Sequence, residues 1–135
     1  MKQIQIGHKE RVTKQISNKD VKTFAELSLD NNPIHLDDSF AKKSIFKKKI
    51  VHGLLVSSLI SAVIANKLPG PGSIYLSQEL KFIKPVFIDD IITAEVEIIE
   101  INTHKRLITL STNCINQNDE TVITGKAIVL NTEME

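Results

Sequence analysis

The sequence has few of the residues that mark cross-linked, metal-bound or membrane-spanning proteins. Its 135 residues include no tryptophan and one cysteine, Cys114, without a Cys-x-x-Cys pair. An internal disulfide and a zinc site built from thiolates are therefore excluded. The first ten residues have no apolar core, and polar residues interrupt the apolar stretch at 53–68. Neither a signal peptide nor a membrane span is predicted, and we expect a cytoplasmic protein that does not bind membranes.

Charge of one sign is also lacking. Lysine and arginine number 17 against 16 aspartates and glutamates, which gives a net charge of +1. This balance argues against a dedicated nucleic-acid binder. The hydrophobic fraction of 41% is sufficient for a folded core, and no repeat or change of composition divides the chain. We expect one domain over residues 1–135.

The N-terminal part of the chain predicts two short helices. Ser17 followed by Asp20 resembles a capping box, and apolar residues at helical spacing predict an amphipathic helix over 18–29. Pro33 requires that helix to end before it. A second short helix is expected to start near Ser39.

A different kind of helix is predicted at about 53–67. Its large apolar residues cover nearly the whole circumference, and most of the remaining positions are small. Such a helix is expected to be buried on all sides. The sequence Leu-Pro-Gly-Pro-Gly at 68–72 ends it.

Alternating apolar and polar residues predict strands after this helix and, more weakly, before it. The stronger patterns are 74–82, 92–98, 107–115 and 122–130, and the weaker are Ile4 with Ile6 and 11–16. Short polar turns between the later strands indicate antiparallel hairpins. We predict an α+β fold in which about five antiparallel strands wrap around the apolar helix. The unpaired edge strands of this sheet need a partner, which favours a homo-oligomer.

The densest polar cluster beside apolar sequence contains Asp30 and His35. A carboxylate and an imidazole on one proline-stiffened loop are suited to share a water or a substrate proton. The alternative is an ordinary polar loop with an exposed histidine. A metal site using His35, Asp37, Asp38 and His52 lacks a defined ligand spacing, so no metal is expected.

Three further features have both a functional and a structural interpretation. The N–H of Gly53, at the start of the apolar helix, is placed as an oxyanion donor, or the glycine only eases the turn. The hydroxyl of Ser61 either donates a hydrogen bond to a backbone carbonyl one helical turn back or keeps a catalytic loop in position. Lys47–Lys49 are either solvated surface or an attractive site for an acidic carrier or nucleotide phosphates.

Taken together, several motifs resemble the MaoC-type (R)-specific enoyl-CoA hydratases of the hot-dog fold. The resemblance spans about residues 15–130 and is strongest in the Asp-x-Asn-Pro-Ile-His block at 30–35. It extends through Val-His-Gly at 51–53, the segment 68–76, Pro-Val-Phe at 85–87 and the strand around 122–125. One departure is Leu29, where the family often has glycine before the aspartate.

The resemblance implies a role for each matched residue. Asp30 and His35 correspond to the catalytic pair, and Gly53 to the glycine that supplies the oxyanion amide. Ser61 corresponds to a supporting serine tied to the aspartate, and Asn32 to a residue that steadies the loop. Ile64, one turn beyond Ser61, is expected to be a wall of the acyl pocket, which would favour shorter acyl chains.

The implied reaction is the reversible hydration of a trans-2-enoyl-CoA to a (3R)-3-hydroxyacyl-CoA, in a homodimer with substrate tunnels at its interface. No metal or redox cofactor is implied, because CoA is part of the substrate. Alternatives on the same fold are a 3-hydroxyacyl-carrier-protein dehydratase and an acyl-CoA thioesterase. A non-catalytic acyl-CoA-binding module would bind the ligand without consuming it.

Overall fold

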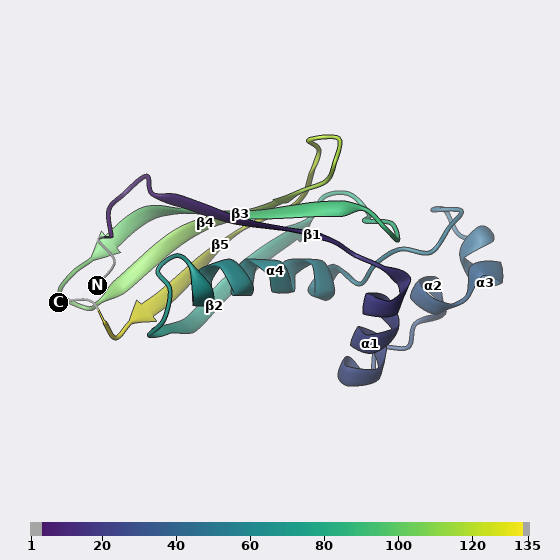
Figure 1. Cartoon of the computed structure of the whole chain (residues 1–135), viewed down its shortest axis with the longest axis horizontal. Coiled ribbons are helices and arrows are strands. Elements are labelled where there is room, and N and C mark those ends of the chain that lie inside the picture. The colour runs from purple at the N-terminus through teal and green to yellow at the C-terminus, as the bar shows by residue number, and fades with distance from the viewer. Residues whose placement is uncertain (1–3, 134–135) are drawn as a thin grey trace.

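The computed structural model describes residues 4–133 and is built around one antiparallel sheet. Its five strands lie in the order β1-β3-β4-β5-β2, with one main helix on one face (Figure 1). The strands are β1 (Lys9–Gln15), β2 (Ser73–Phe82), β3 (Ile91–Asn102), β4 (Leu107–Ile115) and β5 (Thr121–Asn131). The predicted α+β architecture is confirmed. Three of the four strong strand patterns match β2, β4 and β5 to within one residue, whereas β3 extends four residues beyond the pattern at 92–98.

The order of the strands follows from their connections. β3, β4 and β5 form consecutive hairpins, whereas β2 pairs with β5 and β1 with β3. β1 and β2 are therefore the two edge strands, although β2 precedes β3 in the sequence. No local pattern in the sequence specifies this outcome, because it depends on pairing between distant segments.

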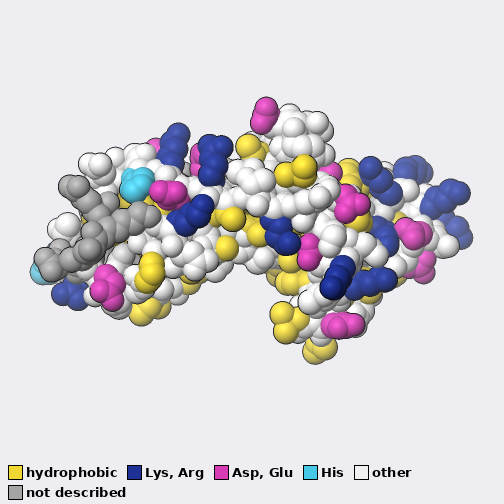
Figure 2. All heavy atoms as spheres, viewed as in Figure 1, with side chains coloured by type: hydrophobic (Ala, Val, Ile, Leu, Met, Phe, Trp, Pro, Cys, Tyr) yellow, Lys and Arg dark blue, Asp and Glu magenta, His cyan; other side chains and the backbone are white. Residues whose placement is uncertain are grey.

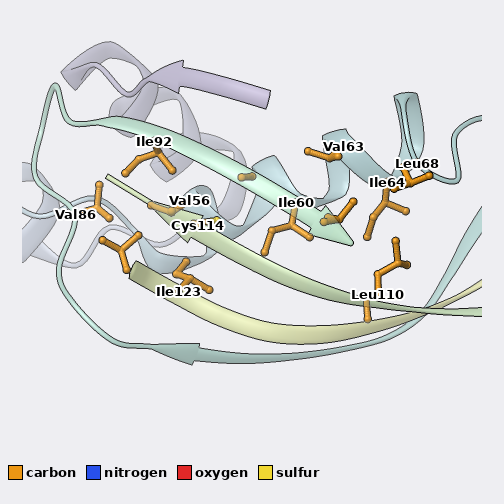
Figure 3. Packing of buried hydrophobic residues seen from close by; sticks show 14 of the residues in the cluster. Val56, Ile60, Val63, Ile64, Leu68, Val86, Ile92, Leu110, Cys114 and Ile123 are labelled. Atoms are coloured by element: carbon orange, nitrogen blue, oxygen red, sulfur yellow. The ribbon is translucent and has the colours of Figure 1, made fainter. Parts of the chain in front are cut away.

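The main helix, α4 (Gly53–Asn66), packs on the sheet and forms the core with it (Figure 3). Val56, Ile60, Val63 and Ile64 of α4 are at most 2% exposed. The facing strands contribute alternate residues, because successive strand side chains point to opposite faces. The fully buried examples include Ile92, Ala94, Val96, Ile98, Leu110 and Cys114. Each large apolar side chain buried here stabilises the fold by about 1.5–3 kcal/mol.

The outer side of α4 differs from the prediction. Leu54 is 62% exposed, and Ser58, Ser61 and Ala65 are also exposed. Burial of this helix on all sides is therefore wrong for the single chain. The reason is geometric, since one sheet covers only one side of a helix and no other described segment packs against the opposite side.

The strand predicted at Ile4 and Ile6 is also wrong, because β1 begins at Lys9. Gly7 has a φ of 93°, which turns the chain and ends any extended run before it. Ile6, next to it, is 66% exposed. The weaker pattern at 11–16 falls within and just after β1.

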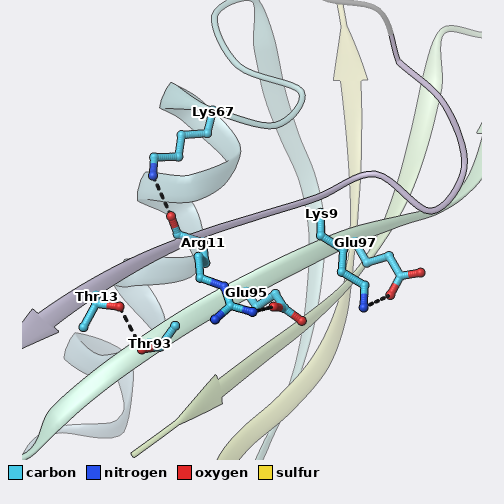
Figure 4. A network of polar contacts seen from close by, with 7 residues as sticks. All are labelled: Lys9, Arg11, Thr13, Lys67, Thr93, Glu95 and Glu97. Atoms are coloured by element: carbon cyan, nitrogen blue, oxygen red, sulfur yellow. Dashed lines mark hydrogen bonds and ion pairs between the residues drawn. The ribbon is translucent and has the colours of Figure 1, made fainter.

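Polar side chains fasten edge strand β1 to β3 (Figure 4). The Oγ1 atoms of Thr13 and Thr93 are 2.8 Å apart, and Arg11 pairs with Glu95. The ammonium of Lys67 donates to the carbonyl of Arg11 at 2.6 Å, which connects the strand to the end of α4. These contacts hold β1 at the sheet edge by its polar face.

Residues 17–52 form three short helices beyond the N-terminal end of α4 (Figure 1). They are α1 (Asn18–Ser28), α2 (Pro33–Leu36) and α3 (Asp38–Lys42). The capping box of Ser17 and Asp20 is confirmed, with bonds of 2.9 and 3.1 Å. Helix α2 was not predicted, since Pro33 marked only the end of α1.

Among residues 4–133, none of the helices is both long enough and apolar enough to cross a bilayer.

Candidate active site

The loop between α1 and α2 carries Asp30 and is held by its own polar side chains. Leu29 ends α1 in a left-handed conformation with a φ of 68°. The Asn32 N–H donates to Oδ1 of Asp30 at 3.3 Å, and the Ile34 N–H donates to Oδ1 of Asn32 at 3.2 Å. Asn32 thus caps α2, with Pro33 in its first turn. This arrangement orients an exposed Asp30 carboxylate beside α2.

His35 lies on α2 and is 8% exposed. Its Nδ1 lies 2.7 Å from the carbonyl oxygen of Ile50. A carbonyl only accepts, so Nδ1 carries the proton and Nε2 presents a lone pair. Burial lowers the pKa of His35, reinforced by the nearby His52 and opposed by the Ile50 hydrogen bond and by Asp30. The imidazole is therefore neutral at neutral pH and able to accept a proton.

His52 stands directly before α4, at 2% exposure, and touches both members of this pair. Its ring stacks on that of His35, with centroids 3.8 Å apart and an interplanar angle of 24°. Its Nε2 lies 3.0 Å from the carbonyl oxygen of Asp30. The rings of Phe24 and His52 make a T-shaped contact, with centroids 4.8 Å apart. His52 therefore connects the Asp30 loop to the start of α4.

Asp30, His35 and His52 each bring one possible metal-ligand atom within 4.8 Å of the others. Ring-nitrogen lone pairs lie in the ring plane, and the two imidazole planes are nearly parallel at stacking distance. Such lone pairs run side by side instead of converging on one ion. The nitrogens bonded to the carbonyls of Ile50 and Asp30 are also already used as donors. This geometry does not favour a metal ion shared by the two imidazoles.

Gly53 is the first residue of α4, so its N–H has no acceptor within the helix. The positive end of the helix dipole adds to the attraction of this amide for a developing negative charge. The ring of Phe82, at the end of β2, lies directly against Gly53. The amide therefore has no acceptor within the helix and lies next to an apolar side chain, as the predicted role requires.

These groups surround a cavity of about 450 Å³ at the junction of α2, α4 and β2. Asp30, His35 and Gly53 line it together with His52, so the structure brings the predicted catalytic pair and oxyanion amide into one cavity. The rest of its described wall is mainly apolar and includes Phe46, Ile50, Leu54, Val56, Phe82, Ile83, Pro85, Val86 and Ile123. This mainly apolar lining is suited to binding an acyl chain.

Three predicted site residues lie outside this wall: Asn32, which caps α2 as described above, Ser61 and Ile64. Ser61 is on the exposed side of α4, and within residues 4–133 no hydrogen bond joins it to Asp30. Ile64 is 2% exposed and belongs to the core between α4 and the sheet. The supporting role of Ser61 and the acyl-pocket role of Ile64 stay predictions.

The lysine run has structural contacts of its own. Lys49 donates to Oδ1 of Asn18 at 2.9 Å and lies 3.8 Å from Asp38. The Lys48 ammonium lies 4.2 Å above the ring of Phe87. Lys42, Lys43 and Lys47 are exposed, and Figure 2 shows lysine side chains gathered at the end of the molecule formed by α2 and α3.

Sequence reasoning assigned no role in the reaction to His52 or Phe82. His52 was weighed only as a metal ligand and as part of the Val-His-Gly motif. Phe82 followed the alternation of its strand, and its contact with Gly53 crosses 29 residues of chain. The apolar pair Phe82–Ile83, which breaks that alternation at the strand end, is the one local signal from which the wall could have been found.

Cys114 is packed in the core. Burial raises the pKa of its thiol to about 12, so the thiolate that reacts with electrophiles is scarce at neutral pH.

Comparison with known proteins identifies the family. The MaoC like domain model matches residues 2–119. The chain is 44% identical to the (R)-specific enoyl-CoA hydratase of Aeromonas caviae, covering 93% of this chain and 94% of that protein. It is 38% identical to a mitochondrial 3-hydroxyacyl-[acyl-carrier-protein] dehydratase of Arabidopsis thaliana, covering 94% and 77%.

Solved structures agree with this assignment. The (R)-hydratase of A. caviae superimposes with a TM-score of 0.92 at 43% identity, covering 96% of this chain and 98% of that one. An R-hydratase of Pseudomonas aeruginosa gives a TM-score of 0.90 at 40% identity, covering 95% and 82%. The chain therefore belongs to the MaoC-like domain family of hydratases and dehydratases and has its hot-dog fold.

Proposed function

We propose that this protein is an (R)-specific enoyl-CoA hydratase, which adds water to trans-2-enoyl-CoA to give (3R)-3-hydroxyacyl-CoA and also catalyses the reverse dehydration. The observation that carries the proposal is the pairing of a neutral His35, with Nε2 available, and the Asp30 carboxylate in one apolar-walled cavity. The similarity to proteins named (R)-specific enoyl-CoA hydratase supports the same reaction.

In the proposed mechanism, the thioester carbonyl accepts a hydrogen bond from the Gly53 N–H. Asp30 and His35 hold one water over C3, and the pair takes a proton from this water as its oxygen bonds to C3. The electrons of the double bond move toward the carbonyl, and the resulting enolate is stabilised by the Gly53 amide. The pair then returns one proton to C2, so the water is added without a net change in the enzyme.

The substrate and setting are part of the proposal. The reaction needs no metal or redox cofactor, since proton transfer and one oxyanion donor suffice. CoA arrives as part of the substrate, and an acyl carrier protein is a second possible carrier, which the exposed lysines near α3 would attract. We propose that residues 1–135 form one hot-dog domain and that the protein acts in the cytoplasm.

We also propose a homodimer in which two sheets join at their β2 edges. Exposed apolar side chains support this surface: Ile74, Tyr75 and Leu76 of β2 are 48%, 38% and 55% exposed. The outer side of α4, with Leu54 at 62% exposure, would be covered in the same association. An unpaired strand edge with apolar side chains favours pairing with a second copy.

The first experiment mixes purified protein with crotonyl-CoA and follows the ultraviolet absorbance of the enoyl thioester. We expect rapid loss with the wild type and a loss of activity of about 10²- to 10⁴-fold in Asp30→Asn and His35→Ala. His104→Gln, on the exposed β3–β4 turn, is the control and should match the wild type.

Three outcomes separate the alternatives. Release of free thiol without hydration indicates a thioesterase, and binding without turnover indicates an acyl-CoA-binding module. Turnover only of the enoyl-carrier-protein thioester indicates a carrier-protein dehydratase. The product configuration is read by chiral analysis, and an (S)-product contradicts the proposal.

A further inference from the structure

His52 has contacts that the proposed chemistry does not require of it. It is 2% exposed, yet it is neither a member of the catalytic pair nor the oxyanion donor. Its Nε2 bonds to the carbonyl oxygen of Asp30, its ring stacks on His35, and the next residue is Gly53. His52 is therefore linked to all three residues to which the mechanism assigns a role: to Asp30 through its backbone carbonyl, to His35 through the ring, and to Gly53 through the peptide bond.

The hydrogen bond fixes the tautomer of this ring. Because a carbonyl oxygen only accepts, the proton of His52 lies on Nε2. Nδ1 is buried and has no hydrogen-bond partner among residues 4–133. A buried acceptor without a partner costs stability. A glutamine amide could provide the same donor, but on a flexible chain and without a ring against His35. The imidazole supplies a rigid donor and an aromatic face together.

We propose that His52 is a positioning residue for the hydration reaction. Its Nε2–H holds the backbone of Asp30 by a hydrogen bond, and its ring holds the plane of the His35 ring. Asp30 and His35 thereby keep fixed positions relative to the Gly53 amide. This inference rests on the proposed hydratase function and adds a residue to its machinery. A displacement of reacting groups by about 1 Å can lower a rate by about 100-fold. A side chain that holds Asp30 and His35 in place can therefore have a large effect on kcat.

The ring also influences the proton affinity of His35. The titratable groups near His35 are Asp30, on the loop after α1, and His52, before α4. The other charged group on the described cavity wall is Lys84, which pairs with Glu120, and α1 presents the uncharged Phe24 to His52. Proximity to His52 contributes to the lowered pKa of His35. Removing the imidazole should therefore let His35 take up a proton at a higher pH.

Two substitutions separate the hydrogen bond to Asp30 from the stacking on His35. His52→Phe keeps an aromatic ring against His35 and removes the donor to Asp30. His52→Gln supplies an amide donor and removes the ring. With crotonyl-CoA, we expect His52→Phe to lower kcat by about 10- to 100-fold with little change in KM. His52→Gln should retain more of kcat than His52→Phe, and the acid limb of its kcat/KM profile should move to higher pH.

The matched control is His104→Gln, the same substitution on an exposed turn, which should leave kcat and the pH profile unchanged. Circular dichroism and thermal melts establish that each variant is folded. A folded His52→Phe with wild-type kcat overturns the proposal. Equal losses of kcat in both variants, without a shifted acid limb, indicate a purely structural histidine and also overturn it.

A measurement without substrate keeps this test distinct from that of the proposed function. NMR correlation of ring nitrogens with ring protons should show the proton on Nε2 in His52 and on Nδ1 in His35. The His35 signals should titrate at higher pH in His52→Gln. A proton on Nδ1 of His52 refutes the hydrogen bond to Asp30 even if the wild type hydrates crotonyl-CoA. If the wild type is inert toward every enoyl thioester, the proposed function fails, and the His52 contacts are still decided by the tautomer.

Discussion

The ring of Phe82 lies so close to Gly53 that a Cβ atom at position 53 would be 2.5 Å from its Cε1 atom. This contact joins the end of β2 to the first residue of α4, at the amide proposed to stabilise the enolate. The absence of a side chain at 53 therefore permits the ring to form a wall of the cavity. Glycine here serves close packing, whatever the backbone conformation.

Gly53→Ala should destabilise the fold and lower activity. The added methyl group must displace the Phe82 ring. Because Phe82 is 55% exposed and its ring can move toward solvent, the cost should be about 1 kcal/mol, the lower end of the range for overpacking. Denaturant unfolding measures the loss of stability, and the crotonyl-CoA assay measures the loss of activity. The double variant Gly53→Ala/Phe82→Leu should recover most of the stability, because the smaller side chain makes room. If the double variant is no more stable than Gly53→Ala, the contact with Phe82 is not the cause.

The activity should depend on pH through His35. The pKa of His35 lies below its usual 6.5, chiefly because the ring is buried. Only the neutral imidazole can accept a proton, so kcat/KM should hold as the pH falls to 6.5 and decline only below it. A profile of kcat/KM against pH tests this, and an acid limb centred above 6.5 would contradict the structure.

Stability should depend on the same group with a defined sign. His35 binds its proton more weakly when folded than when unfolded, so the unfolded state holds more protons in this window. The contribution of His35 to the free energy of unfolding should therefore be complete above pH 6.5. It should decrease as the pH falls toward the folded-state pKa of this ring. His35→Gln should remove this dependence in denaturant titrations. Asp20 and Glu120 also have lowered pKa values, from 3.8 and 4.5, so they act at lower pH.

Asn32→Ala should weaken the loop that carries Asp30. The substitution removes the acceptor for the Ile34 N–H and should cost about 1 kcal/mol, with a fall in kcat because Asp30 and His35 lie on either side of this cap. Asn32→Ser keeps a capping oxygen and should preserve most of the stability and rate. Thermal melts and steady-state kinetics on both variants provide the comparison. An Asn32→Ala protein with wild-type kcat would show that the cap does not position the pair.

Leu76→Lys should weaken the proposed dimer. Leu76 is 55% exposed on edge strand β2, and a charge there removes about 1.5–3 kcal/mol of apolar burial per subunit if the edge is an interface. Light scattering during size exclusion should give a dimer for the wild type and a shift toward monomer for the variant. Ile6→Lys, at a 66% exposed position before β1, is the control and should stay dimeric. A monomeric wild type refutes the β2-edge dimer.

Much of the fold could be predicted from the sequence, because it is encoded by local patterns. Alternation located β2 to β5, and the capping box at Ser17 located α1. The strand expected at Ile4 and Ile6 failed where alternation was short and Gly7 turned the chain. Helix α2 was missed because four residues are too few for a helical period to appear, and its cap on Asn32 lies inside the motif.

The candidate site divides in the same way. The residues Asp30, His35 and Gly53 were identified by their types, their order and the resemblance that they carry. Only the tertiary structure decided that Ile50 fixes the tautomer of His35, that His52 stacks on it, and that Phe82 closes against Gly53. It also decided that one side of α4 stays exposed while Ile64 enters the core. Local periodicity and motif spacing act within a few residues and can be read in sequence, whereas these contacts join segments 15 to 29 residues apart and depend on how the sheet and helices pack.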